Sequence, residues 1–314
     1  MNTEDKDKRW GIIYCPRKGR GSPLKRWRKI ERALHDNDIR FDFIQSESVG
    51  SVSRLVGMLM DNGYKTIIIV GGDTALNDAV NCLMNADKEV RDATAIGIIP
   101  NGLMNDFAHF WGFAGQDDEH IVAWLKQRRT RRVDVGRLDY TTNDGTAASQ
   151  YFINCVNVGL IATIMDLRRK TRHALGSRSL SLLASFILML FQRLDYRMHI
   201  KINASDIRRS NIMTMCIGNS TGYGQTPSAV PYNGWLDVSV VSNPKITQLI
   251  AGFYLLLRGR VLNHRSVRAY RTRQVDVIDA PHAMVSIDGM PVDALATPFT
   301  VTVIPEQINF IIPE

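Results

Sequence analysis

The first third of the chain alternates strand-like and helix-like segments, and this alternation constrains the fold more than any other feature. Short runs rich in Ile, Val and Phe are each followed by a segment with apolar residues at helical spacing. A repeating strand–helix pattern is typical of a parallel sheet covered by helices. The predicted elements are residues 10–15 (strand), 23–36 (helix), 39–46 (strand), 51–63 (helix), 65–70 (strand), 75–85 (helix), 95–100 (strand) and 105–112 (helix). The fold class predicted for residues 1-132 is therefore α/β, with an N-terminal parallel sheet.

From residue 133 onward, strand patterns dominate. The predicted strands are residues 133–140, 149–159, 196–203, 211–219, 236–242, 273–279, 284–289, 298–305 and 308–313. Two helical patterns interrupt them, at residues 176–194 and 245–257. The 314 residues fit two domains at about 150 residues each. We expect a second, β-rich domain over residues 133-314.

The formal net charge of +8 suggests an anionic partner, or only a well-solvated surface. The basic run Lys126–Arg132 has no interleaved aromatic residues and belongs to no recognised nucleic-acid-binding module, so we expect no nucleic acid as a partner. The longest strongly apolar run, residues 180–191, is shorter than the ~20 residues that a membrane-spanning helix needs. We expect no transmembrane segment.

The start of the chain and its cysteines predict a cytoplasmic localisation. The first nine residues are polar and charged, and no apolar signal segment follows them. The four cysteines are far apart and most have apolar neighbours, which is typical of free thiols in a reducing compartment. They are Cys15, Cys82, Cys155 and Cys216.

The segment IIIVGGDTALNDAV, residues 67–80, breaks a buried strand with Gly71, Gly72 and Asp73 and resumes as a helix. Ligands bind at the carboxyl ends of parallel strands, and the N–H groups at a helix start attract phosphate. Glycines let a ligand approach the backbone, and Asp73 could cap the helix, bind magnesium or accept from a ligand hydroxyl. The alternative is a plain glycine turn with an N-cap.

A second turn of this type follows one strand later. PNGLMNDFA places Gly102 after a strand and puts Asn105 and Asp106 at a helix start. Two such turns on neighbouring strands favour a nucleotide site over an isolated glycine turn.

These two turns resemble those of the catalytic domain shared by diacylglycerol kinases, sphingosine kinases and bacterial lipid kinases. In that family they read Gly-Gly-Asp-Gly-Thr-Leu-Asn-Glu and Pro-x-Gly-Thr-Gly-Asn-Asp-Phe-Ala. Further resemblances keep the family's order over nearly the whole chain. They are YCPRKGRG, RRVDVGRL, FINCVNVGL, IGNSTGYG, NGWLDVSVV and SIDGMPV. NAD kinases share the Gly-Gly-Asp turn, but PNGLMNDFA fits the lipid-kinase pattern better.

The resemblance implies an NAD kinase/diacylglycerol kinase-like nucleotide-binding domain, a C-terminal sandwich-like domain for a lipid substrate, and ATP and Mg²⁺ as cofactors. It implies transfer of the γ-phosphate of ATP to a lipid hydroxyl. Asp106 and Asp288 are the implied catalytic and magnesium-binding residues. The implied nucleotide-binding residues are Gly71, Gly72, Asp73, Asn77, Gly102, Asn105, Lys18 and Gly19.

Several positions depart from the family pattern. Thr74, Leu103 and Met104 replace small or hydrogen-bonding residues of the two turns, and Tyr232 replaces an acidic residue of an accessory magnesium site. Met290 stands where the family has the glutamate proposed as general base, and a thioether cannot accept a proton. Two functions therefore stay open: an active lipid kinase, or a catalytically impaired homologue that binds nucleotide or lipid and acts as a regulator.

The segment from Arg168 to Phe191 places basic residues beside an apolar helical pattern. Such a segment predicts peripheral contact with an anionic membrane surface, where a lipid substrate would be met. An ordinary core helix behind a solvated basic loop explains the same pattern. The sequence leaves a homodimer open.

Overall fold

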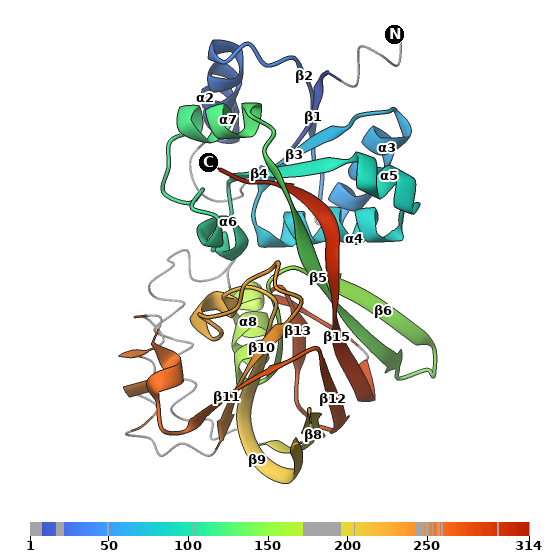
Figure 1. Cartoon of the computed structure of the whole chain (residues 1–314), viewed down its shortest axis with the longest axis vertical. Coiled ribbons are helices and arrows are strands. Elements are labelled where there is room, and N and C mark those ends of the chain that lie inside the picture. Colours follow the sequence, from blue (N-terminus) through green and yellow to red (C-terminus); the bar gives the residue numbers. More distant parts are fainter. Residues whose placement is uncertain are drawn as a thin grey trace. The chain divides into compact units, whose positions relative to one another are not determined.

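The computed structural model describes residues 8–16, 22–48, 50–102, 104–171, 196–203, 205–242, 248, 251–252, 254–255, 258, 260–293 and 295–313. The chain divides into two compact units (Figure 1). Unit 1 comprises Met1–Val135 and Pro305–Glu314, and unit 2 comprises Gly136–Ile304. The chain therefore passes from unit 1 into unit 2 and returns for its last ten residues.

Unit 1 is built on a parallel sheet with the strand order β15-β4-β3-β1-β2. Its strands are β1 (Trp10–Tyr14), β2 (Phe41–Gln45), β3 (Thr66–Gly71), β4 (Ala95–Pro100) and the last part of β15 (Leu295–Ile311). Every residue of β1 and β3 is buried, as expected for central parallel strands covered on both faces. The parallel α/β prediction for the N-terminal part is confirmed.

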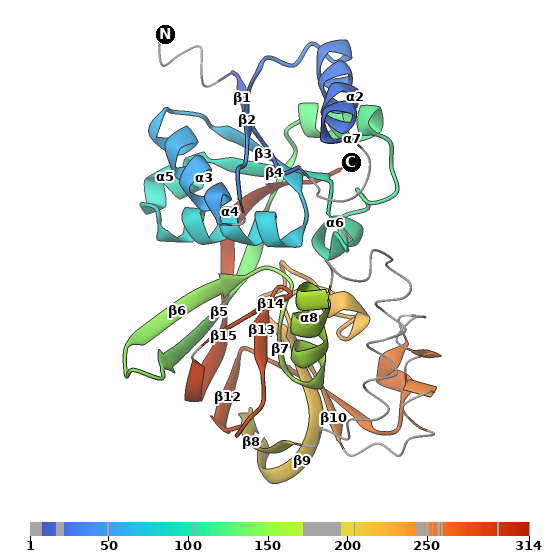
Figure 2. The ribbon, with the colours of Figure 1, turned by 180° about the vertical axis from the view of Figure 1, so that it is seen from behind.

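Helices cover both faces of this sheet. Figures 1 and 2 show α3, α4 and α5 on one face and α2 and α7 on the other. The helices are α2 (Pro23–Asp36), α3 (Ser51–Asp61), α4 (Asp73–Asn85), α5 (Lys88–Ala93), α6 (Asp106–Phe110) and α7 (Asp118–Lys126). Helix α2 starts where predicted because Ser22 accepts from the Lys25 N–H and Pro23 occupies the first turn.

Unit 2 is β-rich, as predicted, and the strand pairs whose register is described in it are antiparallel. Its strands pair in the order β14-β13-β7-β9-β8-β12-β15, while β10 joins β9 to β11 and β5 joins β15 to β6. The strands not yet given are β5 (Thr130–Thr142), β6 (Ala147–Phe152), β7 (Cys155–Gly159), β8 (Tyr196–Ile202), β9 (Ser205–Gly218), β10 (Leu236–Ser242), β11 (Val267–Thr272), β12 (Gln274–Asp279), β13 (Val285–Ile287) and β14 (Met290–Pro291). These strands contribute to one apolar core, which includes Val156, Met215, Ile217 and Val275.

Helical structure in unit 2 includes one helix that the sequence patterns did not predict, α8 (Leu160–Thr171), which packs on β7. Two short 3-10 turns cover Gly222–Gly224 and Val261–Asn263. The helical pattern predicted at residues 176–194 lies outside the described residues, and the one at 245–257 is described only in part. Across the described part of the chain, no helix combines the length and apolar character needed to cross a bilayer.

Candidate functional site

The first glycine turn lies where the sequence places it, at the carboxyl end of the central strand β3. Gly71 ends the strand, and Gly72 precedes helix α4 in an extended conformation with φ −114° and ψ −172°. Gly72, at the N-cap position, has no side chain that could cap α4. The backbone N–H groups of the first turn of this 13-residue helix carry the positive end of the helix dipole.

The second turn packs directly against the first. The N–H of Asn101 donates to the Gly71 carbonyl oxygen at 2.7 Å. A Cβ atom on Gly72 would lie 2.8 Å from the Cα of Gly102, and a Cβ on Gly102 would meet Gly72 in turn. Real Cβ atoms do not approach backbone this closely, so both positions require glycine for the two turns to touch. Glycine here therefore serves turn-to-turn packing, whether or not a ligand approaches.

Asp73 joins the two turns. Its Oδ2 accepts from the Asp106 N–H at 3.0 Å and its Oδ1 accepts from the Phe107 N–H at 3.2 Å. The carboxylate is 7% exposed and lies at the start of α6, where a negative charge complements the helix dipole. Asp73 thus caps α6 instead of its own helix α4, a cross-turn role that spacing along the chain does not reveal.

Asn105 shapes the second turn from within. Its backbone is left-handed, with φ 54° and ψ 46°, a conformation that asparagine adopts more readily than most residues. Its side-chain oxygen accepts from the Gly102 N–H at 2.9 Å, and its amide nitrogen donates to the Gly102 carbonyl at 3.3 Å. These bonds close the loop that carries half-buried Asp106.

Asn77 lies one turn into α4 and is half-buried. Asn81 donates to its side-chain oxygen at 3.1 Å. The neighbouring Asp78 carboxyl has its pKa raised by burial, partly offset by a hydrogen bond from the Gly50 backbone. Burial also raises the pKa of the Cys15 thiol, so Cys15 is protonated at neutral pH and is not a thiolate nucleophile.

In unit 2, Asp288 and Gly289 form the two-residue loop between β13 and β14. Ile287 pairs with Met290 across it, and both loop residues have positive φ, 45° and 82°. An Asp-Gly pair with two positive φ angles is the sequence that a type I′ hairpin favours. The turn places Met290 at the first position of β14, half-buried.

The Asp288 carboxylate holds a neighbouring loop in place. Its Oδ2 accepts from the Ile153 N–H at 2.9 Å, and its Oδ1 accepts from Asn154 at 3.0 Å and from Cys155 at 2.9 Å. The Asp288 N–H donates back to the Cys155 carbonyl at 3.0 Å. With 2% exposure, this carboxylate fixes the entry to β7, and both of its oxygens already accept hydrogen bonds.

The loop before β7 also contains or contacts polar side chains that the sequence motifs do not indicate. The side-chain amide of Asn154 and the hydroxyl of Ser220 are fully buried and have no hydrogen-bond partner among the described residues. Buried polar atoms without a protein partner are normally satisfied by water or a ligand. Only the tertiary structure brings these residues together, because they lie far apart in the chain.

The other predicted positions divide by unit. Gly71, Gly72, Asp73, Gly102 and Asn105 form one contiguous pair of turns in unit 1, with Asp106 and Asn77 adjoining through α6 and α4. Asp288 belongs to unit 2. Lys18, Gly19 and Leu103 lie outside the described residues.

The arrangement in unit 1 fits a phosphate-bearing nucleotide with its magnesium. The start of α4 presents backbone N–H groups and the positive end of a helix dipole, which suit phosphate oxygens. The described residues contain no group of three or more His, Cys, Asp and Glu side chains placed to hold a metal alone. Magnesium commonly takes only one or two carboxylates, with waters and substrate phosphates as its other ligands. Asp106 fits that need better than Asp288.

Two family models match the chain. The model of the diacylglycerol kinase catalytic domain matches residues 9–138, and that of the YegS C-terminal NAD kinase beta sandwich-like domain matches residues 154–312. A diacylglycerol kinase of Bacillus subtilis is 22% identical over 287 residues, which cover 90% of this chain and 89% of that protein. A diacylglycerol kinase of Mycobacterium tuberculosis is 20% identical over 298 residues, 92% of each chain.

Solved structures share the fold. A diacylglycerol kinase from Bacillus anthracis superposes with a TM-score of 0.67 at 16% identity and covers 97% of each chain. The yeast NADH kinase in complex with NADH superposes with a TM-score of 0.53 at 8% identity, covering 97% of this chain and 83% of the other. At such identities the superpositions establish the fold alone.

Proposed function

This chain belongs to the family of diacylglycerol kinase-like lipid kinases, and we propose that it transfers the γ-phosphate of ATP to a hydroxyl group of a lipid. The observation that carries the proposal is the pair of turns at the carboxyl ends of β3 and β4, which are in backbone contact at Gly72 and Gly102. The first of these turns leads directly into the N-terminus of α4. In parallel α/β sheets this is where phosphate-bearing ligands bind.

In this proposal each site residue of unit 1 has its own role in binding the nucleotide. Backbone N–H groups at the start of α4 bind phosphate oxygens, and Gly72 lets the second turn pack close beside them. Asp73 fixes the second turn, so that Asp106 is held at the start of α6. Asp106 would ligate Mg²⁺ together with waters and phosphate oxygens, and the metal would neutralise charge on the phosphates. Asn77 orients the nucleotide from α4.

In unit 2 we propose that Asp288 positions the loop before β7. Met290 occupies the position at which the family has its general base, and it cannot accept a proton. Phosphoryl transfer proceeds through a loose transition state, so catalysis depends more on positioning and charge than on proton removal. A missing base lowers the rate by about 10²–10⁴-fold without abolishing transfer. The acceptor hydroxyl would lose its proton to water or to another carboxylate, such as Asp106 or Asp293.

The second candidate function is a catalytically impaired homologue that binds nucleotide or lipid and regulates a partner. Three observations favour it. Met290 cannot accept a proton. Thr74 puts a branched, half-buried side chain at the start of α4. Met104 is bulky, apolar and 38% exposed beside the second turn.

For the acceptor we propose diacylglycerol as the first lipid to test, because the relatives are named diacylglycerol kinases. Sphingoid bases, phosphatidylglycerol and isoprenoid alcohols also carry a hydroxyl group and complete the panel. We propose that the protein acts in the cytoplasm and meets its substrate at an anionic membrane surface without spanning it. The oligomeric state, including a homodimer, is testable by light scattering.

The deciding experiment incubates the purified chain with ATP, Mg²⁺ and this lipid panel and follows transfer of labelled phosphate. We expect transfer to at least one lipid, and loss of at least about tenfold in the Asp106→Ala variant because a metal ligand is removed. A nucleotide-dependent rise in melting temperature, measured in parallel, reports binding alone. Binding without transfer supports the regulatory alternative. If the wild type shows no transfer above that of the Asp106→Ala variant and ATP causes no thermal shift, both nucleotide-dependent functions are ruled out.

A further inference from the structure

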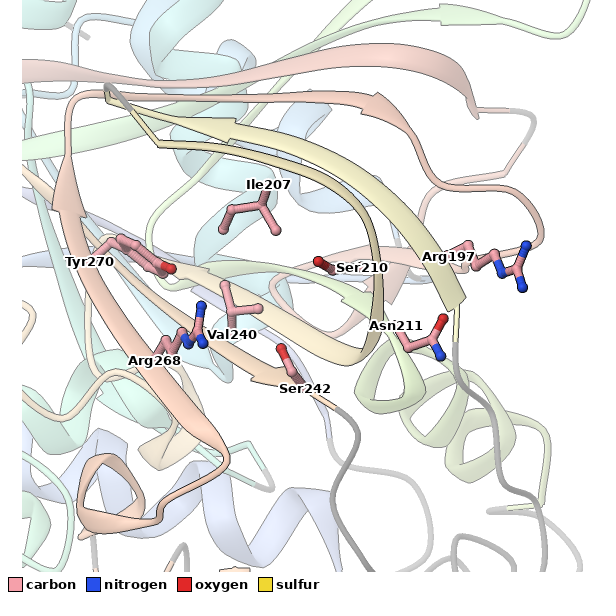
Figure 3. A pocket seen from close by; sticks show the side chains of 8 residues that line it. All are labelled: Arg197, Ile207, Ser210, Asn211, Val240, Ser242, Arg268 and Tyr270. Atoms are coloured by element: carbon pink, nitrogen blue, oxygen red, sulfur yellow. The ribbon is translucent and has the colours of Figure 1, made fainter.

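Unit 2 contains an open pocket of about 490 Å³, formed where β8, β9, β10 and β11 lie side by side (Figure 3). Its floor is apolar. Val240, 2% exposed, belongs to the unit's core, and Ile207 and Tyr270 pack against that core. A volume of this size is within the ~300–1,000 Å³ of typical ligand sites.

Two exposed arginines flank this floor. Figure 3 shows Arg268, from β11, and Arg197, from β8, on opposite sides of Val240 and Ser210. Sheet pairing sets Arg268 opposite Val240 and Arg197 opposite Asn211, so both arginines extend from hydrogen-bonded strands. The backbone positions of both arginines are thus fixed by strand pairing, and neither residue lies in a loop.

The described lining of the pocket carries a net positive charge. None of the described lining residues is acidic. Within the described part of the chain, neither Arg197 nor Arg268 forms an ion pair. The contrast with Arg271, three residues further along β11, is direct: Arg271 donates to both oxygens of Asp237, at 2.7 and 3.1 Å. Among the described residues Arg268 has no such carboxylate, which leaves its guanidinium group for an external anion.

Neutral hydrogen-bonding groups complete the lining. Ser210, Asn211 and Ser242 contribute hydroxyl and amide groups between the arginines. Their side chains make no hydrogen bond to another residue in the described ranges. Guanidinium groups match the geometry of phosphate oxygens and bind them with charge-assisted hydrogen bonds, and hydroxyl and amide donors add to that set.

We propose that this pocket is a binding site for a phosphate group, carried either by an anionic phospholipid headgroup or by a soluble phosphate ester. The cationic rim binds the phosphate, and the apolar floor accepts the carbon chain attached to it. The site lies within unit 2 and uses none of the residues assigned to phosphate transfer, so it goes beyond the kinase function and does not depend on it.

The soluble arm of the test titrates the full-length chain with glycerol 1-phosphate and measures binding by calorimetry. We compare the wild type with Arg268→Gln, Arg197→Gln and the control Arg265→Gln, which removes the same charge from an exposed arginine outside the pocket. Loss of one charge-assisted contact should weaken binding roughly tenfold for Arg268→Gln, less for Arg197→Gln at the outer rim, and little for the control. All three side chains are exposed, so the melting temperatures should agree.

The membrane arm measures co-flotation of the same four proteins with phosphatidylcholine vesicles, with and without phosphatidylglycerol. Binding that needs phosphatidylglycerol and is lost in Arg268→Gln but kept in Arg265→Gln identifies a lipid headgroup as the source of the phosphate. Binding of glycerol 1-phosphate with the same variant pattern, but no vesicle dependence, identifies a soluble ester. If Arg268→Gln behaves like Arg265→Gln in both arms, the proposal is wrong.

Discussion

At the scale of single residues, Met290 is the substitution with the largest expected effect on phosphate transfer, because a thioether cannot accept a proton. Asp288 and Gly289 form a two-residue turn in which both residues have positive φ, and the Asp288 carboxylate accepts from three backbone N–H groups. The backbone around position 290 is therefore well ordered by hydrogen bonds, and the side chain at that position carries no proton-accepting group. A carboxylate restored there would be presented by a turn already in place.

We expect Met290→Glu to raise kcat for phosphate transfer by about 10²-fold or more, because a positioned general base contributes about 10²–10⁴-fold. The matched control is Met290→Gln, which has the same length and polarity but cannot take the proton. The measurement is the initial rate with the preferred lipid at saturating ATP. Equal rates for the Glu and Gln variants would show that position 290 has no part in proton removal.

At the scale of elements, the two turns of unit 1 behave as one structure. Gly72 and Gly102 are in backbone contact, and the carboxylate of Asp73 spans from α4 to the start of α6. Sequence patterns placed each turn correctly, but treated Asp73 as a cap of its own helix or as a ligand. The cross-turn cap depends on the parallel pairing of β3 with β4, which brings Gly71 opposite Pro100.

Gly72→Ala tests this contact, because the new Cβ would meet the Gly102 backbone at 2.8 Å. We expect a loss of about 1–3 kcal/mol in the free energy of unfolding, as for overpacked sites, and a smaller nucleotide-dependent thermal shift. The control is Gly57→Ala in α3, whose Cβ would lie 3.6 Å from the Cys82 sulfur in ordinary contact. Alanine is favoured over glycine within a helix, so the control should be neutral or stabilising. Equal destabilisation of both variants would contradict the turn-to-turn packing.

At the scale of the whole molecule, strand β15 links the two units. Its early part belongs to unit 2, where Phe299 lies in the core, and its end pairs in parallel with β4 in unit 1. In unit 1, Phe310 meets the rings of Phe107 and Trp111 at centroid distances of 5.0 and 5.9 Å. The last residues of the chain thus support the loop that carries the second turn.

Two substitutions on this one strand should therefore destabilise different units. Phe310→Ala removes a side chain that is 1% exposed and should cost unit 1 about 3–5 kcal/mol; Phe299→Ala, 2% exposed, should cost unit 2 a similar amount. Amide hydrogen exchange read by mass spectrometry separates the effects. We expect lost protection in β3 and β4 for the first variant and in β8 and β12 for the second. Loss of protection in the same strands for both variants would contradict a division of the chain into two units.

The sequence by itself determined the elements whose signals are local. The strand–helix alternation predicts the parallel sheet of residues 10–100, and the Gly, Asn and Asp positions indicate both turns. The sequence pattern predicts two strands, at residues 298–305 and 308–313, whereas the structure has one strand, β15, from Leu295 to Ile311. Periodicity cannot show that a strand continues past a proline in a position that the pairing tolerates.

Only the tertiary structure decided which distant groups meet. Asp73 caps α6, and Asp288 holds the backbone before β7. Arg271 is paired with Asp237, whereas Arg268 has no ion-pair partner among the described residues. Each of these outcomes depends on strand order and register, which bring together residues that are tens to more than a hundred positions apart. Residue type and spacing report local conformation, whereas the partner of a buried or surface charge is set by long-range pairing.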